Sequence, residues 1–564
     1  MAASAGIEKE LGVSDRPIFS ALPLTPRNSQ EVVFTGQKEN GVSVSSDTVP
    51  NDDAGDYVTG WKLAALVAGM SAACFLMLLD TSILVTAVPR ITTKFHSLND
   101  IGWYGSSYNL ACAAFQPISG KFYTYFKIKW VFLTFLFVFE IGSLICGIST
   151  SSIMFIIGRA VSGLGSSGIM NGSFAIIAAA APLERRPGLM GTVMGICQLG
   201  MVSGPLVGGA LTQYTSWRWC FYINLPIGAV TALLILLINI PERLAKPKTG
   251  LFKIILTKFD LPGFCIFAPF AIMILLALEW GGNQYPWKSA TVIGMFCGGG
   301  GALILFLLWE LRVGADAMIP LDLIKKKEIW SSCLTGLFLI SSVLGSSYFL
   351  PIYFQSVKGA TPFQSGVDML PTILTQLFFA VAAGSKSRLL SPLCHRQRMP
   401  NRHLLRPPLH ALPSSSTAQW AGYQILLGFS RGISIQIPII AIQAHTSAER
   451  TSVITATLVF CQNFGGAVFL SVANSIFNNK LKSELLSRLP SDRVEAIIDA
   501  GATGVKLVTL PQELPAVVAS YAKGFDAVMY LLVGLACAMF ITSWELGFTD
   551  IRKKKAAAPA VAEA

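Results

Sequence analysis

Two ionisable side chains, Asp80 and Arg159, lie inside long apolar stretches of this 564-residue sequence. An ionised carboxylate costs at least about 2.5 kcal/mol at the centre of a bilayer, whereas a protonated carboxyl group carries no charge. A group that can exist in both forms suits coupling to protons. Arginine keeps its proton and therefore needs an anion or a water-filled cavity. We expect both residues to act in proton coupling; the alternatives are a carboxyl group bonded to a nearby hydroxyl and a fixed link between helices.

Small residues recur every four positions in a later apolar stretch. Gly200, Gly204 and Gly208 fall on one face of a helix, with Pro205 and Gly209 beside them. This spacing lets helix backbones approach closely, and proline introduces a kink. The segment therefore predicts a close helix crossing, either with a functional role or as plain helix packing, and the two readings are compatible.

Polar residues at membrane depth are candidates for a ligand cavity. They are Gln116, Asn171, Gln198, Gln355, Gln376, Arg431, Gln436 and Gln462. A mainly apolar cavity with a few hydrogen-bonding groups suits a hydrophobic organic ligand, and we expect Phe221, Tyr348 and Phe379 to share it. For each polar residue, hydrogen bonding between helices is the alternative. Glu140 is either a further proton relay or a residue that only faces a neighbouring helix.

The sequence lacks the motifs of several enzyme and pump classes. It has no GxxxxGK(S/T) phosphate-binding loop, which argues against an ATP-driven pump, and neither HExxH nor GxSxG occurs in the apolar stretches. The cysteines form no CxxC pair, so we expect no metal site, no cofactor and no enzymatic activity. The net charge of +12 comes from basic residues between apolar runs, which predicts cytoplasmic loops rather than nucleic-acid binding.

Composition indicates a chain that lies mostly in a lipid bilayer. Hydrophobic residues make up 52% and charged residues 13%, about half the charged fraction typical of soluble domains. A membrane-spanning helix needs about 20 apolar residues. This rule predicts thirteen spans, near residues 63–87, 103–123, 130–149, 153–180, 188–213, 219–240, 261–280, 290–311, 331–355, 366–384, 420–443, 452–476 and 524–547. Basic residues concentrate in alternate loops, which places the N-terminus in the cytoplasm.

An internal repeat relates two parts of the chain. The pairs Glu184-Arg185 and Cys197-Gln198 recur in the same order as Glu449-Arg450 and Cys461-Gln462. Upstream of each set, Arg159 and Arg431 stand early in an apolar helix. The shared order predicts two related halves with a substrate site between them.

Four motifs carry a resemblance to a known family. They are Leu79-Asp80-Thr81 continuing to Ala87-Val88-Pro89, Gly158-Arg159 with Gly163 and Gly165, the GxxxGPxxGG pattern from Gly200 to Gly209, and Trp217-Arg218-Trp219 through Asn224-Leu225-Pro226. They resemble the fourteen-span drug:proton antiporters of the major facilitator superfamily, most closely fungal exporters of toxins and other secondary metabolites. The resemblance implies a role for Arg159 in proton transfer and an antiporter-specific bend at the glycine motif. One departure is Thr124, four positions after Gly120, where relatives often carry an acid that forms a gating salt bridge.

The resemblance implies an all-α polytopic membrane protein with the major facilitator fold, a 14-helix design with 13 visible spans. The expected parts are a disordered cytoplasmic tail (1–60), an N-terminal six-helix half (61–241), two linking helices with loops (242–329), a C-terminal half (330–548) and a cytoplasmic tail (549–564). We expect a monomer in the plasma membrane, or alternatively the vacuolar membrane, that exports an amphipathic organic compound in exchange for protons. The alternatives are a non-transporting sensor or inactive relic, and an importer of a nutrient or siderophore.

Residues 385–416 occupy the place of the family's eleventh span without having its composition. They contain six lysines and arginines, three histidines and five prolines, and no acidic residue. Inserting six unpaired basic residues into lipid would cost over about 10 kcal/mol. Either this anomalous polar segment is a cytoplasmic loop, which inverts the topology downstream, or it is read out of frame. Only the second explanation keeps the C-terminal tail in the cytoplasm.

Overall fold

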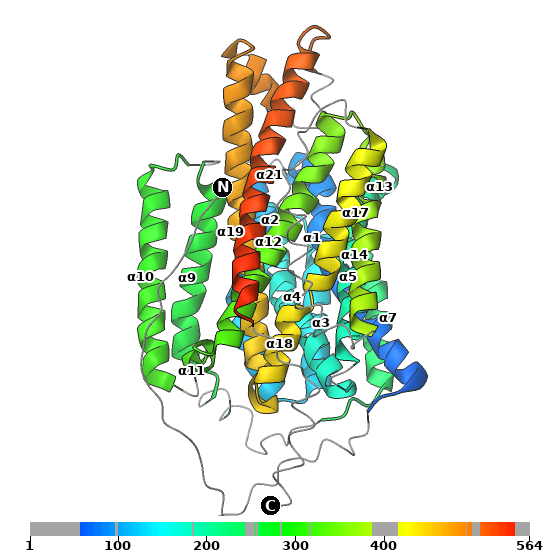
Figure 1. Ribbon diagram of the computed structural model, residues 1–564, viewed down its shortest axis with the longest axis vertical. Helices are drawn as coiled ribbons and strands as arrows, with labels where there is room; N and C mark the ends of the chain where they lie inside the picture. Colours follow the sequence, from blue (N-terminus) through cyan, green and yellow to red (C-terminus); the bar gives the residue numbers. More distant parts are fainter. Residues whose placement is uncertain are drawn as a thin grey trace, which may run out of the picture. The chain divides into compact units, whose positions relative to one another are not determined.

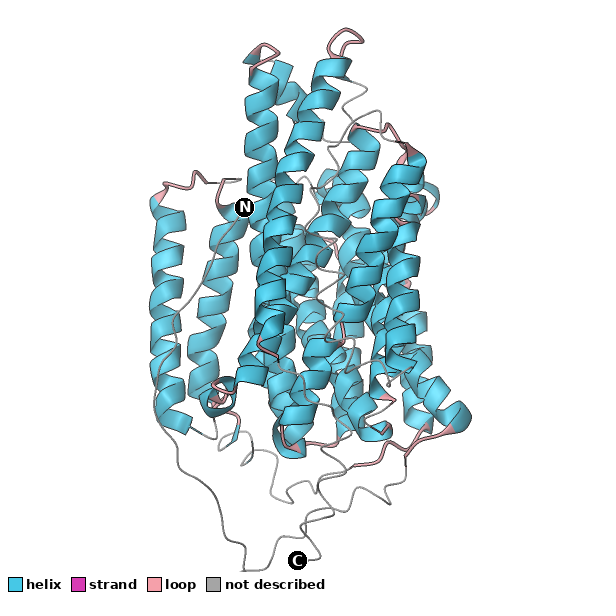
Figure 2. Ribbon diagram, viewed as in Figure 1, coloured by secondary structure: helices cyan, strands magenta, loops and turns pink. Residues whose placement is uncertain are grey.

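Long apolar runs form helices in a membrane because no water is present there to satisfy backbone polar groups, so each segment must bond to itself. The computed structural model describes residues 57–95, 100–182, 185–242, 254, 258–282, 285–314, 317–385, 416–491, 493–498 and 508–546. Among these residues, helices joined by connecting segments make up the structure (Figure 2). The two predicted tails, apart from residues 57–60, and the polar segment, apart from its two end residues, lie outside the described residues.

The helices follow one another in an order that matches the predicted spans. The first group is α1 (Gly60–Phe95), α2 (Ile101–Tyr125), α3 (Ile128–Ile148), α4 (Ser152–Ala180), α5 (Arg186–Tyr214), α6 (Trp219–Tyr222) and α7 (Asn224–Leu237). Next come α9 (Leu261–Trp280), α10 (Ala290–Val313) and α11 (Leu321–Ile324). The last group is α12 (Lys327–Ser356), α13 (Pro362–Val367), α14 (Leu370–Ser385), α17 (Thr417–Ser434), α18 (Ile437–His445), α19 (Ala448–Leu486) and α21 (Leu514–Trp544).

Twelve helical segments in the described part of the chain are long and apolar enough to cross a membrane. They coincide with twelve of the thirteen predicted spans. The remaining predicted span, 103–123, lies within α2, whose glycine, serine, tyrosine and asparagine residues make it less apolar than its neighbours. The prediction of an all-α polytopic membrane protein is therefore confirmed.

Helix packing follows the same scheme in two parts of the chain (Figure 1). In the first part, α1 packs against α5 and α7, and α2 packs against α4. In the second part, α12 packs against α19 and α21, and α14 packs against α17. These repeated pairs agree with the internal repeat of the sequence, as in transporters built from two related halves.

The helices α14 and α17 run side by side in the same direction. Near the start of the pair, Gln424 donates a hydrogen bond to the carbonyl oxygen of Asp368 at 2.8 Å. Further along, Gln436 donates to the carbonyl oxygen of Ala380 at 2.7 Å. Between the two bonds the residue number rises on both helices, so α14 and α17 are parallel. The start of α17 therefore lies beside the start of α14 and far from the end of α14.

The first half contains the same arrangement. Arg159 of α4 donates to the carbonyl oxygen of Tyr104 in α2 at 3.1 Å, and Gln116 further along α2 donates to the carbonyl oxygen of Ser167 at 2.7 Å. These two helices also run in one direction, and α3 connects them. The corresponding connection in the second half is residues 386–415, outside the described residues. The direction of α17 is thus the one that the fourteen-span design predicts. It contradicts the alternative in which the polar segment is a loop and the helices after it are inverted.

The direction of α17 makes a reading-frame error the explanation to test for the polar segment. If the frame shifts near Gly384 and is restored near Thr417, an alternative frame should encode roughly 20 apolar residues with a helix-compatible pattern. Sequencing the transcript across this stretch checks the prediction directly. Polar residues in both alternative frames would reject the frame shift and make the segment a real feature of the protein.

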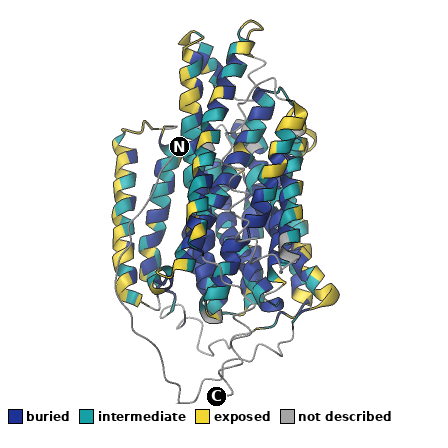
Figure 3. Cartoon of the chain, viewed as in Figure 1, coloured by how far each residue is buried: buried dark blue, intermediate teal, exposed yellow. Residues whose placement is uncertain are grey.

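The helices α9 and α10 form a pair outside the two repeated groups. α10 packs against α9, and α9 packs against α2 and α19. Much of α10 is exposed (Figure 3), and its exposed residues include Ile304, Leu305 and Leu308. Apolar side chains on the outside of a membrane helix are expected to contact lipid.

Candidate functional site

The structure brings Asp80 of α1 and Arg159 of α4 together in a fully buried ion pair. Nη1 of Arg159 donates to Oδ2 of Asp80, and neither side chain has any exposed surface. Oδ1 of Asp80 accepts a hydrogen bond at 3.2 Å from the side-chain amide of Asn224 in α7. The guanidinium group also lies over the ring of Tyr108, 4.5 Å from its centroid. Four helices therefore meet at this pair, although its members are 79 residues apart.

A second carboxyl group lies next to this cluster. Asn224, besides contacting Asp80, donates to the hydroxyl of Ser143 in α3 at 3.1 Å. One turn before Ser143 stands Glu140, whose carboxyl group occupies the space beside Gly228 of α7. Both carboxyl oxygens of Glu140 are buried without a hydrogen-bond partner among the described residues. Glu140 thus faces the neighbouring helix α7, which is one of the two alternatives predicted from the sequence. It also adds a second carboxyl group next to the polar cluster of Asp80, Asn224 and Ser143.

The glycine motif of α5 packs against α1, the helix that carries Asp80. A Cβ atom at Gly204 would lie 2.7 Å from Cβ of Ser82 and 2.8 Å from the backbone nitrogen of Ile83. Gly200 and Gly208 are equally tight against α1, whereas Gly209 has open space around it. Three of the four glycines therefore form the helix contact, and Pro205 lies within the same helix. The fourth glycine does not take part in it.

Arg431 of α17 is buried in a corresponding place in the second half. Its Nη2 atom donates to the carbonyl oxygen of Ser342 at 2.7 Å and to the hydroxyl of Ser346 at 2.6 Å, both in α12. The hydroxyl of Ser342 lies 3.4 Å from the same nitrogen. Each repeated group thus has a buried arginine that donates to the first helix of its group, but among the described residues Arg159 alone of the two meets a carboxylate there.

Most of the neutral polar residues form hydrogen bonds between helices. Besides its bond to α4, Gln116 accepts a bond from Asn463 of α19 at 3.2 Å, which links the two groups of helices. The amide of Asn171 lies 3.4 Å from the hydroxyl of Ser119, and Gln436 bonds to α14 as described above. Gln355 donates to Ser365 at 3.0 Å near the end of α12. For these residues the structure shows the interhelical alternative.

The remaining members of the predicted set have no such bond in the described structure. Gln198 is half-buried on α5, and Gln376 is buried on α14. The side-chain nitrogen of Gln462 is buried on α19 and has no partner among the described residues. These residues come from three different helices, and no hydrogen bond in the described part of the chain joins them into one site.

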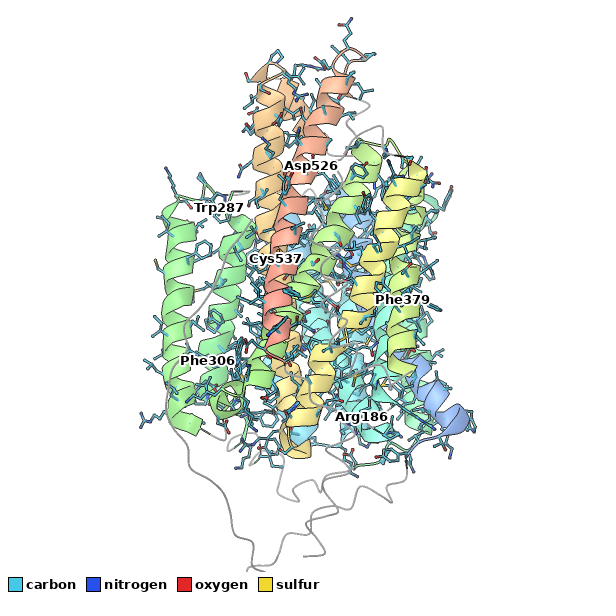
Figure 4. The ribbon with its side chains drawn as sticks, in the orientation of Figure 1. Arg186, Trp287, Phe306, Phe379, Asp526 and Cys537 are labelled. Carbon is cyan, nitrogen blue, oxygen red and sulfur yellow. The ribbon has the colours of Figure 1, made fainter. Side chains whose placement is uncertain are left out.

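The three aromatic residues of the predicted lining have different surroundings. Phe221 is fully buried among other rings, 5.3 Å from Phe155 between centroids. Tyr348 of α12 is 45% exposed. Phe379, labelled on α14 in Figure 4, stands edge-on to Phe429 at 4.5 Å. No ring contact among the described residues joins the three, so their sharing of one cavity stays a prediction.

A pocket of about 110 Å³ lies between helices of the two repeated groups. Tyr123, Asn171 and Arg186 line it from one group, and Gln443 and Thr451 line it from the other. Asn171 is the member of the predicted cavity set that lines this pocket. Arg186, labelled in Figure 4, lies at the start of α5, at the side that the basic loops predict to be cytoplasmic.

The two groups also contact each other directly at this side. A Cβ atom at Gly120 of α2 would lie 2.8 Å from the carbonyl oxygen of Ser452 in α19. Next to it, Lys121 donates to the carbonyl oxygen of Lys258 at 2.9 Å. At the position where the family resemblance implies an acid, Thr124 bonds to the backbone of its own helix at 3.0 Å. Close backbone packing therefore joins α2 and α19 here.

Comparison with known proteins identifies relatives over most of the chain. Residues 70–470 match the Major Facilitator Superfamily. The MFS-type transporter pigP of Monascus ruber is 49% identical over 91% of this chain and 90% of its own length. The efflux pump mlcE of Penicillium citrinum is 45% identical over 94% of this chain and 98% of its own. The crystal structure of the human organic anion transporter MFSD10 shares the fold, with a TM-score of 0.53 and 14% identity over 85% of this chain and 99% of that one.

Proposed function

The chain belongs to the Major Facilitator Superfamily, and from this we propose that it is an efflux transporter that exports an amphipathic organic compound in exchange for protons. Relatives with 44 to 45% identity are named efflux pumps and are similar to this chain over 87 to 94% of its length. Such a transporter has binding and gating residues but performs no covalent chemistry. We place it in the plasma membrane, where export removes the compound from the cell.

The observation that carries proton exchange is the buried pair of Asp80 and Arg159. A bare carboxylate at this depth is stabilised by the guanidinium group and by Asn224. Protonation of Asp80 removes its charge and with it the attraction that holds α1 to α4 at this point. The charged and the protonated forms of Asp80 thus favour different arrangements of α1 and α4. This is the property that alternating access coupled to protons requires.

Glu140 supports the same proposal. An ionised carboxylate without any hydrogen bond would cost several kcal/mol in buried surroundings, so we infer that this group carries a proton in the described conformation. Asn224 joins Asp80 to Ser143, which stands one turn after Glu140 on α3. When Asp80 is paired with Arg159, Glu140 therefore offers a second place for a proton in the same polar cluster.

The proposal is tested with inside-out membrane vesicles from cells that express the full chain. Rhodamine 6G and 1-pyrenebutyrate serve as amphipathic compounds, and the vesicle interior is made acidic. We expect at least one compound to accumulate, and a protonophore that collapses the gradient should stop accumulation. Accumulation that persists with the protonophore would reject proton exchange. Movement only in the opposite direction would favour an importer, and the absence of any movement would favour a sensor.

A further inference from the structure

Arg431 is a buried cation whose partners are all neutral. Its side chain is 3% exposed. All of its hydrogen bonds in the described structure come from Nη2 to Ser342 and Ser346, and its Nε atom has no partner there. Guanidinium groups stay charged, and buried ones are normally paired with an anion. This arginine therefore has the capacity to bind a negatively charged group that the described residues do not supply.

The sequence offers few carboxylates that could fill this role. Residues 386–415, which follow the neighbouring helix α14, contain no acidic residue. In the last group of helices, Asp526 is the carboxylate in the middle of a span, on α21 (Figure 4), and no ion pair joins it to Arg431. In the first group, by contrast, Asp80 neutralises Arg159. The second half thus has a buried arginine like that of the first half, but in the described structure two serines stand where the first half has a carboxylate.

Arg431 lies about one helical turn from residues at the contact between the two groups of helices. One turn later, Ile435 belongs to an apolar cluster that also contains Met70 and Met190 of the first group. The amide of Gln436 fills the space beside Gly191 of α5. One turn before Ser342, Leu339 belongs to the same cluster. Arg431 thus stands one helical turn from side chains at the contact between the two groups, the place where transporters of this build hold their substrates.

We propose that Arg431 binds the carboxylate, or an equally acidic oxyanion, of the exported compound, which rests on the proposed export function and defines its substrates as amphipathic organic acids. The planar guanidinium group recognises such oxygens with two parallel hydrogen bonds. Ser342 and Ser346 position the group from one side. The apolar residues next to it suit the uncharged part of the same compound.

The test measures binding by the purified full chain in lipid nanodiscs. The probes are 1-pyrenebutyrate and the uncharged alcohol 1-pyrenebutanol, and energy transfer from tryptophan to pyrene reports binding, with empty nanodiscs as background. We expect the wild-type protein to bind the acid about tenfold or more tightly than the alcohol. Arg431→Gln should remove this preference by weakening only the acid. Arg431→Lys should keep part of it, because the charge remains without the planar geometry.

Arg488→Gln is the matched control, since it removes the same charge from an exposed position in the turn that follows α19. It should leave the preference for the acid unchanged. Equal affinity of the wild type for acid and alcohol would overturn the proposal, as would an Arg431→Gln variant that loses both equally or retains the preference. Displacement of the acid by chloride at constant ionic strength would assign the site to an inorganic anion and reject organic acids. Because this assay measures binding, failure of proton-driven export would not alter its result.

Discussion

Replacing Asp80 with asparagine is expected to abolish export driven by a pH gradient while compound binding remains measurable. The asparagine side chain has nearly the same shape but cannot alternate between a charged and a neutral form. Arg159 would lose its only carboxylate partner in the described structure. Removing one partner of a buried ion pair typically costs about 3–5 kcal/mol, so the variant should also unfold at a lower temperature. Vesicle transport at equal surface expression, together with thermal unfolding, measures both effects.

Two further variants separate lost coupling from lost stability. Asp80→Asn combined with Arg159→Gln leaves no uncompensated charge, so stability should largely return while gradient-driven export stays absent. Asp322→Asn makes the same chemical change in the exposed pair with Arg450 and should have little effect, because exposed ion pairs contribute about 0–1 kcal/mol. Normal gradient-driven export by the Asp80→Asn variant would remove Asp80 from the mechanism.

Gly204→Leu is expected to stop exchange, or to let protons leak, in protein that still inserts into the membrane. Even the first side-chain atom would lie 2.7 Å from Cβ of Ser82, closer than van der Waals contact allows. Backbone atoms of α1 form the other side of the contact, so α1 and α5 must separate. Overpacking of this kind typically costs about 1–3 kcal/mol. It would also displace α1, and Asp80 with it.

Gly209→Leu is the matched control for this change. It lies in the same motif and on the same helix, but nothing stands within 4 Å of a Cβ atom there. We expect it to transport normally and to unfold at the wild-type temperature. Equal effects of the two substitutions would show that helix propensity, not the contact with α1, explains the loss. Full activity of Gly204→Leu would show that the close crossing is unnecessary.

The sequence by itself determined the spans and their order. Whether a stretch of about 20 residues is stable in lipid depends on the sum of its own side-chain contributions, which can be read without knowing its neighbours. For this reason twelve of the predicted spans coincide with helices long and apolar enough to cross the membrane. The four-residue spacing of Gly200, Gly204 and Gly208 likewise fixed a common helix face, because helical periodicity is a local property. Pro205 and Gly209 belong to the same motif, but spacing alone did not show that Gly209 points away from α1.

Only the tertiary structure decided which polar groups meet. The partners of Asp80 depend on how four helices are rotated against one another, and side chains from 79 to 144 residues away contribute to its surroundings. The same rotations place Glu140 beside this cluster and Phe221 among other aromatic rings. The structure also shows a difference between Arg159 and Arg431, which look equivalent in sequence. Among the described residues, Arg159 is paired with a carboxylate and Arg431 contacts only neutral groups. Composition places a residue in the membrane, but packing of the helices determines its neighbours.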